Sequence, residues 1–314
     1  MGCGTWSASS WSGFAASTAS RATTGSSGVF ARDSMKDELN PKNITKREAM
    51  DSVDHPNSTP IIVGLDVTGS MSRVLRSVID NLNTFVENIY SRNIVPDPQI
   101  CFMGIGDADF DRAPLQVTQF ESDIRIAESL RDIWLEQCGG GNDKESYTLP
   151  WFFAQNHVYA DAIEKRGKKG YLFTMGDECC PARITKAQIK KVFGYDIEES
   201  DIPTEDLLAQ VSQNWEVYHL VITEGNFYSG RYRDHDGPRK IKDTWGKYLE
   251  ERCIYVTDMT KIPEILVSIL QVDNGADVAG VLDSWDGSTR MVVRDAISGL
   301  TEKKNATTEA VVNF

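Results

Sequence analysis

From Pro60 onward, short apolar runs alternate with segments whose apolar residues recur every three or four positions. Continuous apolar runs of this length are typical of parallel strands that are covered on both faces, and the periodic segments are typical of amphipathic helices. Strands separated by helix-length segments favour parallel pairing. The sequence therefore predicts an α/β fold, with a doubly wound, mostly parallel, six-stranded sheet and helices on both of its faces.

The predicted strands and helices follow in regular order along the chain. The strands are expected at residues 61–65, 99–105, 115–120, 171–174, 217–223 and 253–257, with the third at an edge of the sheet. The main helices are expected at residues 74–89, 124–135, 146–165, 241–251 and 262–272.

Two flanking regions differ from this central domain, which we place at residues 58–273. Residues 1–57 form a low-complexity N-terminal arm rich in Ser, Thr, Gly and Ala. This composition buries little apolar surface, so the arm alone is expected to be flexible. Its aromatic residues Trp6, Trp11 and Phe14 indicate docking, either on the domain or on a partner. Residues 274–314 are expected to form a polar C-terminal tail that contains one amphipathic helix at 291–300.

The overall charge and the cysteine pattern exclude several classes of function. A net charge of −13 makes general nucleic-acid binding unfavourable, because a polyphosphate backbone would be repelled. No run approaches the ~20 apolar residues of a membrane-spanning helix, and no secretory signal is recognisable. The six cysteines are irregularly spaced, without a Cys-x-x-Cys pair. We therefore expect a cytoplasmic protein that is not bound to a membrane.

Polar residues lie in four of the loops between the predicted strands and helices. Asp66 ends the first strand, Asp107 follows the second, and Asp177 follows the fourth. A glycine-rich loop, residues 139–141, precedes the third helix. In a doubly wound sheet, ligands bind beyond the carboxyl ends of the strands. These polar residues are therefore expected to share one rim of the sheet.

The segment Asp66-Val67-Thr68-Gly69-Ser70-Met71 carries a specific resemblance. It resembles the Asp-x-Ser/Thr-x-Ser signature of the metal-ion-dependent adhesion site (MIDAS) in von Willebrand factor A domains. The resemblance spans about residues 60–272, and it is closer to bacterial and phage-type intracellular members than to secreted adhesion molecules. It implies a Rossmann-like fold with a metal site at the rim.

The resemblance also implies a set of metal ligands. Direct hydroxyl ligands would come from Thr68 and Ser70, whereas Asp66 and Asp177 would hold the ion directly or through water. Ser146 is the first candidate for the hydroxyl that the family supplies before its third helix, and Asn142 is the second. The implied ion is Mg²⁺, which prefers octahedral oxygen ligands and keeps several waters.

The sequence departs from the family pattern after the fourth strand. The family commonly has Thr-Asp-Gly there, whereas this chain has Gly176-Asp177-Glu178. The additional carboxylate of Glu178 would favour Mn²⁺ or Ca²⁺ over Mg²⁺ if it faces the ion. Asp107 is a further candidate for the surroundings of the ion, because the first two strands should be neighbours.

A site with few direct carboxylates leaves its ion electropositive and open to an incoming acid. The resemblance therefore implies a non-enzymatic module that binds a Glu or Asp of another protein through the metal, as a scaffold would. A second hypothesis is a metal-dependent hydrolase that uses the surplus acids Asp107, Asp109 and Glu178. A third is a structural assembly component whose arm docks on neighbouring subunits. Without a metal, Asp66, Thr68 and Ser70 would serve as helix caps. The oligomeric state is not indicated.

Overall fold

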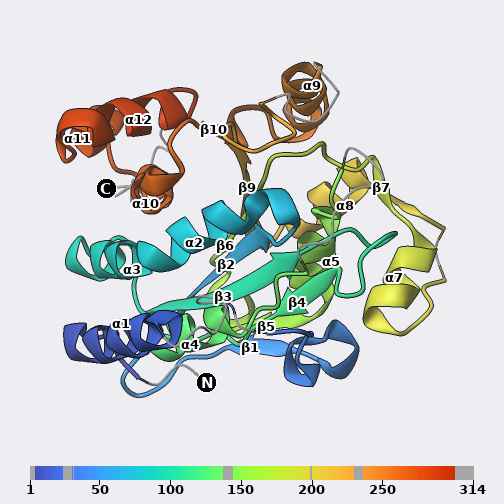
Figure 1. Cartoon of the computed structure of the whole chain (residues 1–314), viewed down its shortest axis with the longest axis horizontal. Helices are drawn as coiled ribbons and strands as arrows, with labels where there is room; N and C mark the ends of the chain where they lie inside the picture. Colours follow the sequence, from blue (N-terminus) through green and yellow to red (C-terminus); the bar gives the residue numbers. More distant parts are fainter. Residues whose placement is uncertain are drawn as a thin grey trace, which may run out of the picture.

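The central element is a six-stranded sheet in the order β10-β9-β6-β2-β3-β4 (Figure 1). The computed structural model describes residues 4–23, 30, 32–136, 144–198, 200–229 and 236–300. All neighbouring strands of the sheet are parallel except the edge pair β3 and β4. The predicted fold class and the predicted edge strand are therefore confirmed. The strands are β2 (Thr59–Asp66), β3 (Pro98–Ile105), β4 (Leu115–Val117), β6 (Gly170–Gly176), β9 (Trp215–Ile222) and β10 (Cys253–Val256).

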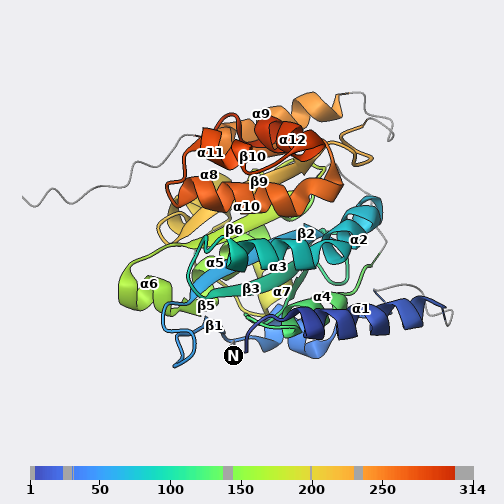
Figure 2. The same ribbon diagram turned by 90° about the vertical axis from the view of Figure 1, so that its left-hand side faces the viewer.

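Side chains alternate between the two faces of the sheet, and each face has its own apolar core. In β2, Ile61 and Val63 join one core and Ile62 joins the other. The first core, whose helices are prominent in Figure 2, is built with α2 (Ser72–Asp80), α3 (Leu82–Ser91), α4 (Arg125–Arg131), α10 (Ile262–Asp273), α11 (Val278–Asp283) and α12 (Gly287–Ile297). The second is built with α5 (Thr148–Asn156), α7 (Lys186–Phe193), α8 (Thr204–Val211) and α9 (Gly237–Leu249).

The single helix predicted at residues 74–89 is wrong, because the chain forms two helices there. α2 ends at Asp80 and α3 begins at Leu82. Between them, the side-chain amide of Asn81 donates to the backbone oxygen of Ser77 at 2.8 Å. The backbone of Asn81 has φ −106° and ψ 6°, outside the helical region, and the side-chain bond to the preceding turn accompanies this break. The apolar periodicity runs across the break because both helices pack on the same core.

The long helix predicted at residues 146–165 is also wrong. The chain forms α5, then the short strand β5 (Val158–Ala160), then α6 (Asp161–Arg166). β5 pairs in parallel with β1 (Arg47–Ala49), which belongs to the region before the central domain. Because its pairing partner is so distant in sequence, local periodicity carries no sign of this strand. A further two-stranded sheet joins β7 (Arg183–Ile184) to β8 (Ile202–Pro203).

The N-terminal arm contains a helix, α1 (Ala8–Thr23), which lies against the first core (Figure 2). Trp6, just before this helix, and Phe14, within it, are only 8% and 7% exposed. The indole nitrogen of Trp6 donates to Asn83 Oδ1 on α3 at 3.0 Å. These aromatic contacts supply the apolar burial that the surrounding Ser and Ala residues lack.

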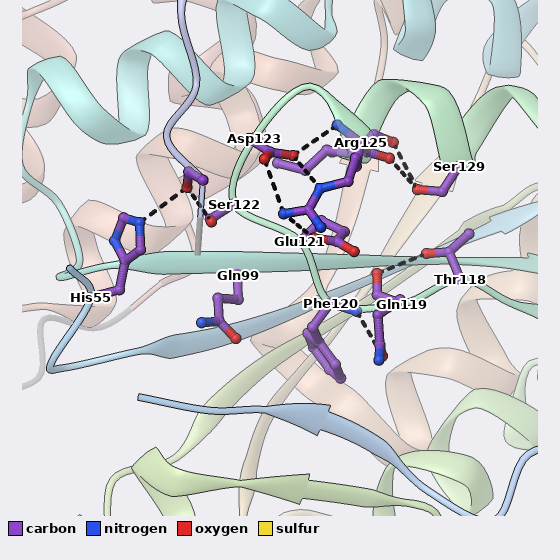
Figure 3. A network of polar contacts seen from close by, with 12 residues as sticks. His55, Gln99, Thr118, Gln119, Phe120, Glu121, Ser122, Asp123, Arg125 and Ser129 are labelled. Carbon is purple, nitrogen blue, oxygen red and sulfur yellow. Dashed lines mark hydrogen bonds and ion pairs between the residues drawn. The ribbon is translucent and has the colours of Figure 1, made fainter. Parts of the chain in front are cut away.

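A polar network holds the start of the arm (Figure 3). The backbone oxygen of Gly4 accepts hydrogen bonds from His55 Nε2, at 3.0 Å, and from Ser122 Oγ. A side chain at Gly4 would overlap the Asp123 carboxylate, both of whose oxygens accept hydrogen bonds from the Arg125 guanidinium. In this structure, therefore, the arm docks on its own domain. Within the described residues, no helix has the length and apolarity needed to cross a membrane.

Candidate metal site

Three strands bring the predicted site residues to the same edge of the sheet. In the parallel ladders, Asp66 pairs with Ile105 of β3, and Leu65 pairs with Met175 of β6. Asp66 is therefore level with Gly176, and Asp177 follows one residue later. The rim predicted from the strand ends is formed by this register.

Asp66 is fully buried and both of its carboxylate oxygens accept hydrogen bonds. Oδ1 accepts from the backbone nitrogen of Thr68 at 2.9 Å and from its hydroxyl at 2.6 Å. Oδ2 accepts from the hydroxyl of Tyr147 at 3.1 Å. Because the Thr68 hydroxyl gives its proton to Asp66, its own lone pairs remain available to a cation. This geometry suits the hydroxyl ligand role that the sequence predicts for Thr68.

A second buried carboxylate, Asp177, lies close enough to repel Asp66. Asp177 is 1% exposed, and its Oδ2 accepts from the backbone nitrogen of Phe227 at 2.8 Å. Burial, reinforced by the charge of Asp177, raises the pKa of Asp66 to about 7 from an ordinary value of 3.8. Two carboxylates held this way favour either a proton or a cation between them.

The loop before α5 adds a third carboxylate, which the sequence reasoning did not include in the site. Glu145 is 4% exposed, and its Oε2 has no hydrogen-bond partner. Burial and the nearby charge of Asp66 raise its pKa to about 12. A buried, unpartnered carboxylate oxygen is strongly unfavourable unless a cation or proton satisfies it. The predicted donor set is therefore compatible with a divalent cation, with Glu145 as an additional candidate.

Two other predicted residues are engaged with the loop after β3. Ser146 is buried, and its hydroxyl oxygen accepts from the backbone nitrogen of Ala108 at 2.9 Å. Asp107 Oδ1 accepts from the backbone nitrogen of Asp109 at 2.7 Å, and the backbone nitrogen of Asp107 donates to Asp111 Oδ2. Ser146 therefore ties the loop before α5 to the loop after β3, and its part in holding an ion stays a prediction.

The remaining predicted residues are Glu178, Ser70 and Asn142, and only the first has a described side chain. Glu178 is half-buried, and its backbone oxygen accepts from the indole nitrogen of Trp245 at 3.0 Å. Ser70 lies in a short 3-10 turn, Gly69–Met71, and its side chain is outside the described part of the structure. Asn142 falls in residues 137–143, which are also outside it.

Within the described ranges, no group of three or more His, Cys, Asp and Glu side chains is arranged to hold a metal ion. The donor set implied by the resemblance is of a different kind, because three of its five members, Thr68, Ser70 and Ser146, are hydroxyls. Beside the site lies a surface hollow of about 240 Å³. Acidic and basic residues both line it, among them Asp107, Glu145, Lys144 and Arg183.

Neither the sequence models of known families nor the curated proteins match this chain. Among solved structures, it is similar to the pilus adhesin SpaC from Lactobacillus rhamnosus GG, at 10% identity and a TM-score of 0.47, over 72% of this chain and 31% of that protein. It is similar to proximal thread matrix protein 1 from the mussel byssus, at 10% identity and a TM-score of 0.43, over 68% of this chain and 47% of that one. It is also similar to the SpRpn10 VWA domain, at 13% identity and a TM-score of 0.33, over 59% of this chain and 81% of that one. This chain spans less than half of the length of the first two proteins. At these identities and TM-scores, the similarities carry no conclusion about what this chain binds.

The buried carboxyl of Asp66 predicts a pH dependence of stability in metal-free protein. Its pKa is raised on folding, so it stabilises the folded state fully below about pH 4 and loses that contribution as the pH rises through about 7. In chelator, the free energy of unfolding should fall over this window, and Asp66→Asn should flatten the fall. Urea denaturation at several pH values measures this, with the exposed Asp80→Asn as control. Parallel curves for wild type and Asp66→Asn would contradict the raised pKa.

Proposed function

We propose that this chain is a von Willebrand A-type module that holds a divalent cation at the rim and binds an acidic residue of another protein through it. The proposal rests on the signature at Asp66, Thr68 and Ser70 together with the geometry of the rim. The cation would be Mg²⁺, with Mn²⁺ or Ca²⁺ as alternatives. No enzymatic step is part of the proposal.

The observation that carries the proposal is a cluster of buried carboxyl groups under the rim, where burial and mutual repulsion oppose ionisation in the absence of a cation. Asp66 is fully buried, Asp177 raises its pKa, and Glu145 has an unpartnered oxygen. Removing carboxylates from water is costly unless opposite charge or hydrogen bonds replace the lost hydration. A cation held by these residues and by the Thr68 hydroxyl would relieve the repulsion.

The charge of the chain explains why an acidic partner would need the cation. The protein carries a net charge of −13, and the hollow beside the site is lined in part by Asp107 and Glu145. An acidic side chain approaching this surface alone would be repelled. A bound divalent cation would supply positive charge and a coordination position for the incoming carboxylate. Lys144 and Arg183, at the same hollow, would favour an acidic neighbour in the partner.

The first expected outcome is stabilisation by metal. Adding Mg²⁺ or Mn²⁺ at about 100 times its Kd should stabilise the folded protein by about 2.7 kcal/mol, and the melting temperature should rise accordingly. Asp66→Asn and Thr68→Val should each abolish the rise, because they remove a charge and a hydroxyl oxygen from the site.

Thr59→Val is the matched control for Thr68→Val. Thr59 stands at the other end of β2, where its hydroxyl donates to the backbone oxygen of Pro96 at 2.6 Å. This variant should be less stable and should still respond to metal. A wild-type protein whose melting temperature is the same with metal and with chelator would contradict the proposed function.

The second expected outcome concerns the partner. Peptides selected from a random displayed library in Mg²⁺ should share a Glu or Asp. Replacing that residue by Gln or Asn, or adding chelator, should remove binding, because only an ionised carboxylate completes the coordination of the cation. Fluorescence anisotropy measures both comparisons. Selected peptides that bind equally well in chelator would contradict the role of the cation, and metal-dependent cleavage of the peptides would favour a hydrolase instead.

A further inference from the structure

Tyr147, which no sequence pattern marked, is in direct contact with the buried carboxylate of the site. It directly follows Glu145 and Ser146 and stands immediately before α5. Its side chain is fully buried, and its hydroxyl donates to Asp66 Oδ2 at 3.1 Å. Burial and the charge of Asp66 raise the pKa of Tyr147 well above its usual value, so the hydroxyl remains a donor.

The Tyr147 hydroxyl occupies the space that a side chain at position 176 would take. A Cβ built on Gly176 would overlap this hydroxyl and would lie 2.6 Å from Tyr147 Cζ. Gly176 is the last residue of β6 and is level with Asp66 across the ladder. A side chain on β6 at this position and the ring of Tyr147 therefore exclude each other. In this chain, the hydroxyl that donates to Asp66 Oδ2 comes from the loop before α5 and not from β6.

The ring of Tyr147 is held by an aromatic stack beneath the rim. It packs edge-on against His219 on β9, with ring centroids 4.9 Å apart, and lies 5.4 Å from the ring of Trp245 on α9. His219 is stacked on Trp245 at 3.5 Å, and its Nδ1 is 2.9 Å from the hydroxyl of Thr174. Close packing on several sides leaves a buried ring little freedom to change rotamer. The position of the Tyr147 hydroxyl is therefore set by β6, β9 and α9 together.

The same stack reaches the loop that carries the second carboxylate. The indole nitrogen of Trp245 donates to the backbone oxygen of Glu178, which follows Asp177. The aromatic stack thus contacts both sides of the site, at Asp66 through Tyr147 and next to Asp177 through Trp245.

The hydrogen bonds to Asp66 leave one lone pair, on Oδ2, available to a cation. Oδ1 already accepts two hydrogen bonds from Thr68, whereas Oδ2 accepts one, from Tyr147. A carboxylate oxygen has two lone pairs, so Oδ2 keeps one lone pair for an ion or its water. Without Tyr147, the carboxylate would be free to turn about its Thr68 contacts. Outer partners that orient a metal ligand typically change metal affinity 10–100-fold when removed.

We propose that Tyr147 is a positioning residue of the cation site, which fixes the orientation of Asp66 and requires glycine at position 176. The inference rests on the proposed function, because the site that Tyr147 orients is the proposed cation site. Tyr147 itself does not touch the ion.

The test compares metal affinity with stability in two conservative variants. Tyr147→Phe keeps the ring and removes the hydroxyl, and it should weaken Mn²⁺ binding about tenfold in isothermal titration calorimetry. Tyr171→Phe is the matched control, because Tyr171 stands at the other end of β6 and its hydroxyl accepts from Asn274 at 2.7 Å. The control should lower the melting temperature in chelator and leave Mn²⁺ affinity unchanged. A purely structural role would lower stability in both variants and affinity in neither.

A second measurement tests the exclusion between the two positions. Gly176→Ala should lower the melting temperature strongly in wild type and much less in the Tyr147→Leu background, because the smaller side chain leaves room for Cβ. Additive effects of the two substitutions, or wild-type Mn²⁺ affinity in Tyr147→Phe, would overturn the inference while the metal response of wild type stands. A wild-type protein that does not bind Mn²⁺ would overturn the proposed function and this inference together.

Discussion

The burial of the Asp66 carboxylate is the constraint on which the proposed cation site depends. Asp66 ends the central strand β2, accepts hydrogen bonds from Thr68 and Tyr147, and faces the charge of Asp177. Three separate segments of the chain therefore meet at one ionisable group without exposure to water. Such a group is stable as an ion only when hydrogen bonds or opposite charge replace its lost hydration. This requirement connects the fold of the sheet to the proposed cation.

The register of the parallel strands positions the Asp66 carboxylate. Parallel pairing of β2 with β3 and β6 places the strand ends at one edge, so residues far apart in sequence become neighbours. The two cores fix the helices on either face and, with them, the loops that begin at the rim. The aromatic stack of His219 and Trp245 packs on Tyr147 and so connects the second core to Asp66. Changes within that core are therefore expected to reach the site through Tyr147.

The sequence was sufficient for the fold class because its signals are local. Apolar runs identify the strands of the sheet, and polar residues at their ends identify the rim. The breaks at Asn81 and Val158 were missed because they depend on a side-chain hydrogen bond and on a distant strand, β1. The positions of Glu145 and Tyr147 at the rim were missed for a related reason. Each meets neighbours that are adjacent only after folding, and neither belongs to a recognisable motif. The one local sign was Gly176, where the family that the sequence resembles commonly has Thr, and a side chain at this position would overlap Tyr147.

The most direct test of the account is to locate a bound ion. Crystals of the full chain soaked in Mn²⁺ would give an anomalous difference map that marks the metal independently of any assumed ligand. If the proposed cation site exists, a Mn²⁺ peak is expected at the ends of β2 and β6. It should lie within coordination distance of the Thr68 hydroxyl and next to the Asp66 and Asp177 carboxylates. A map with no peak there, or with Mn²⁺ bound only elsewhere, would contradict the proposed site.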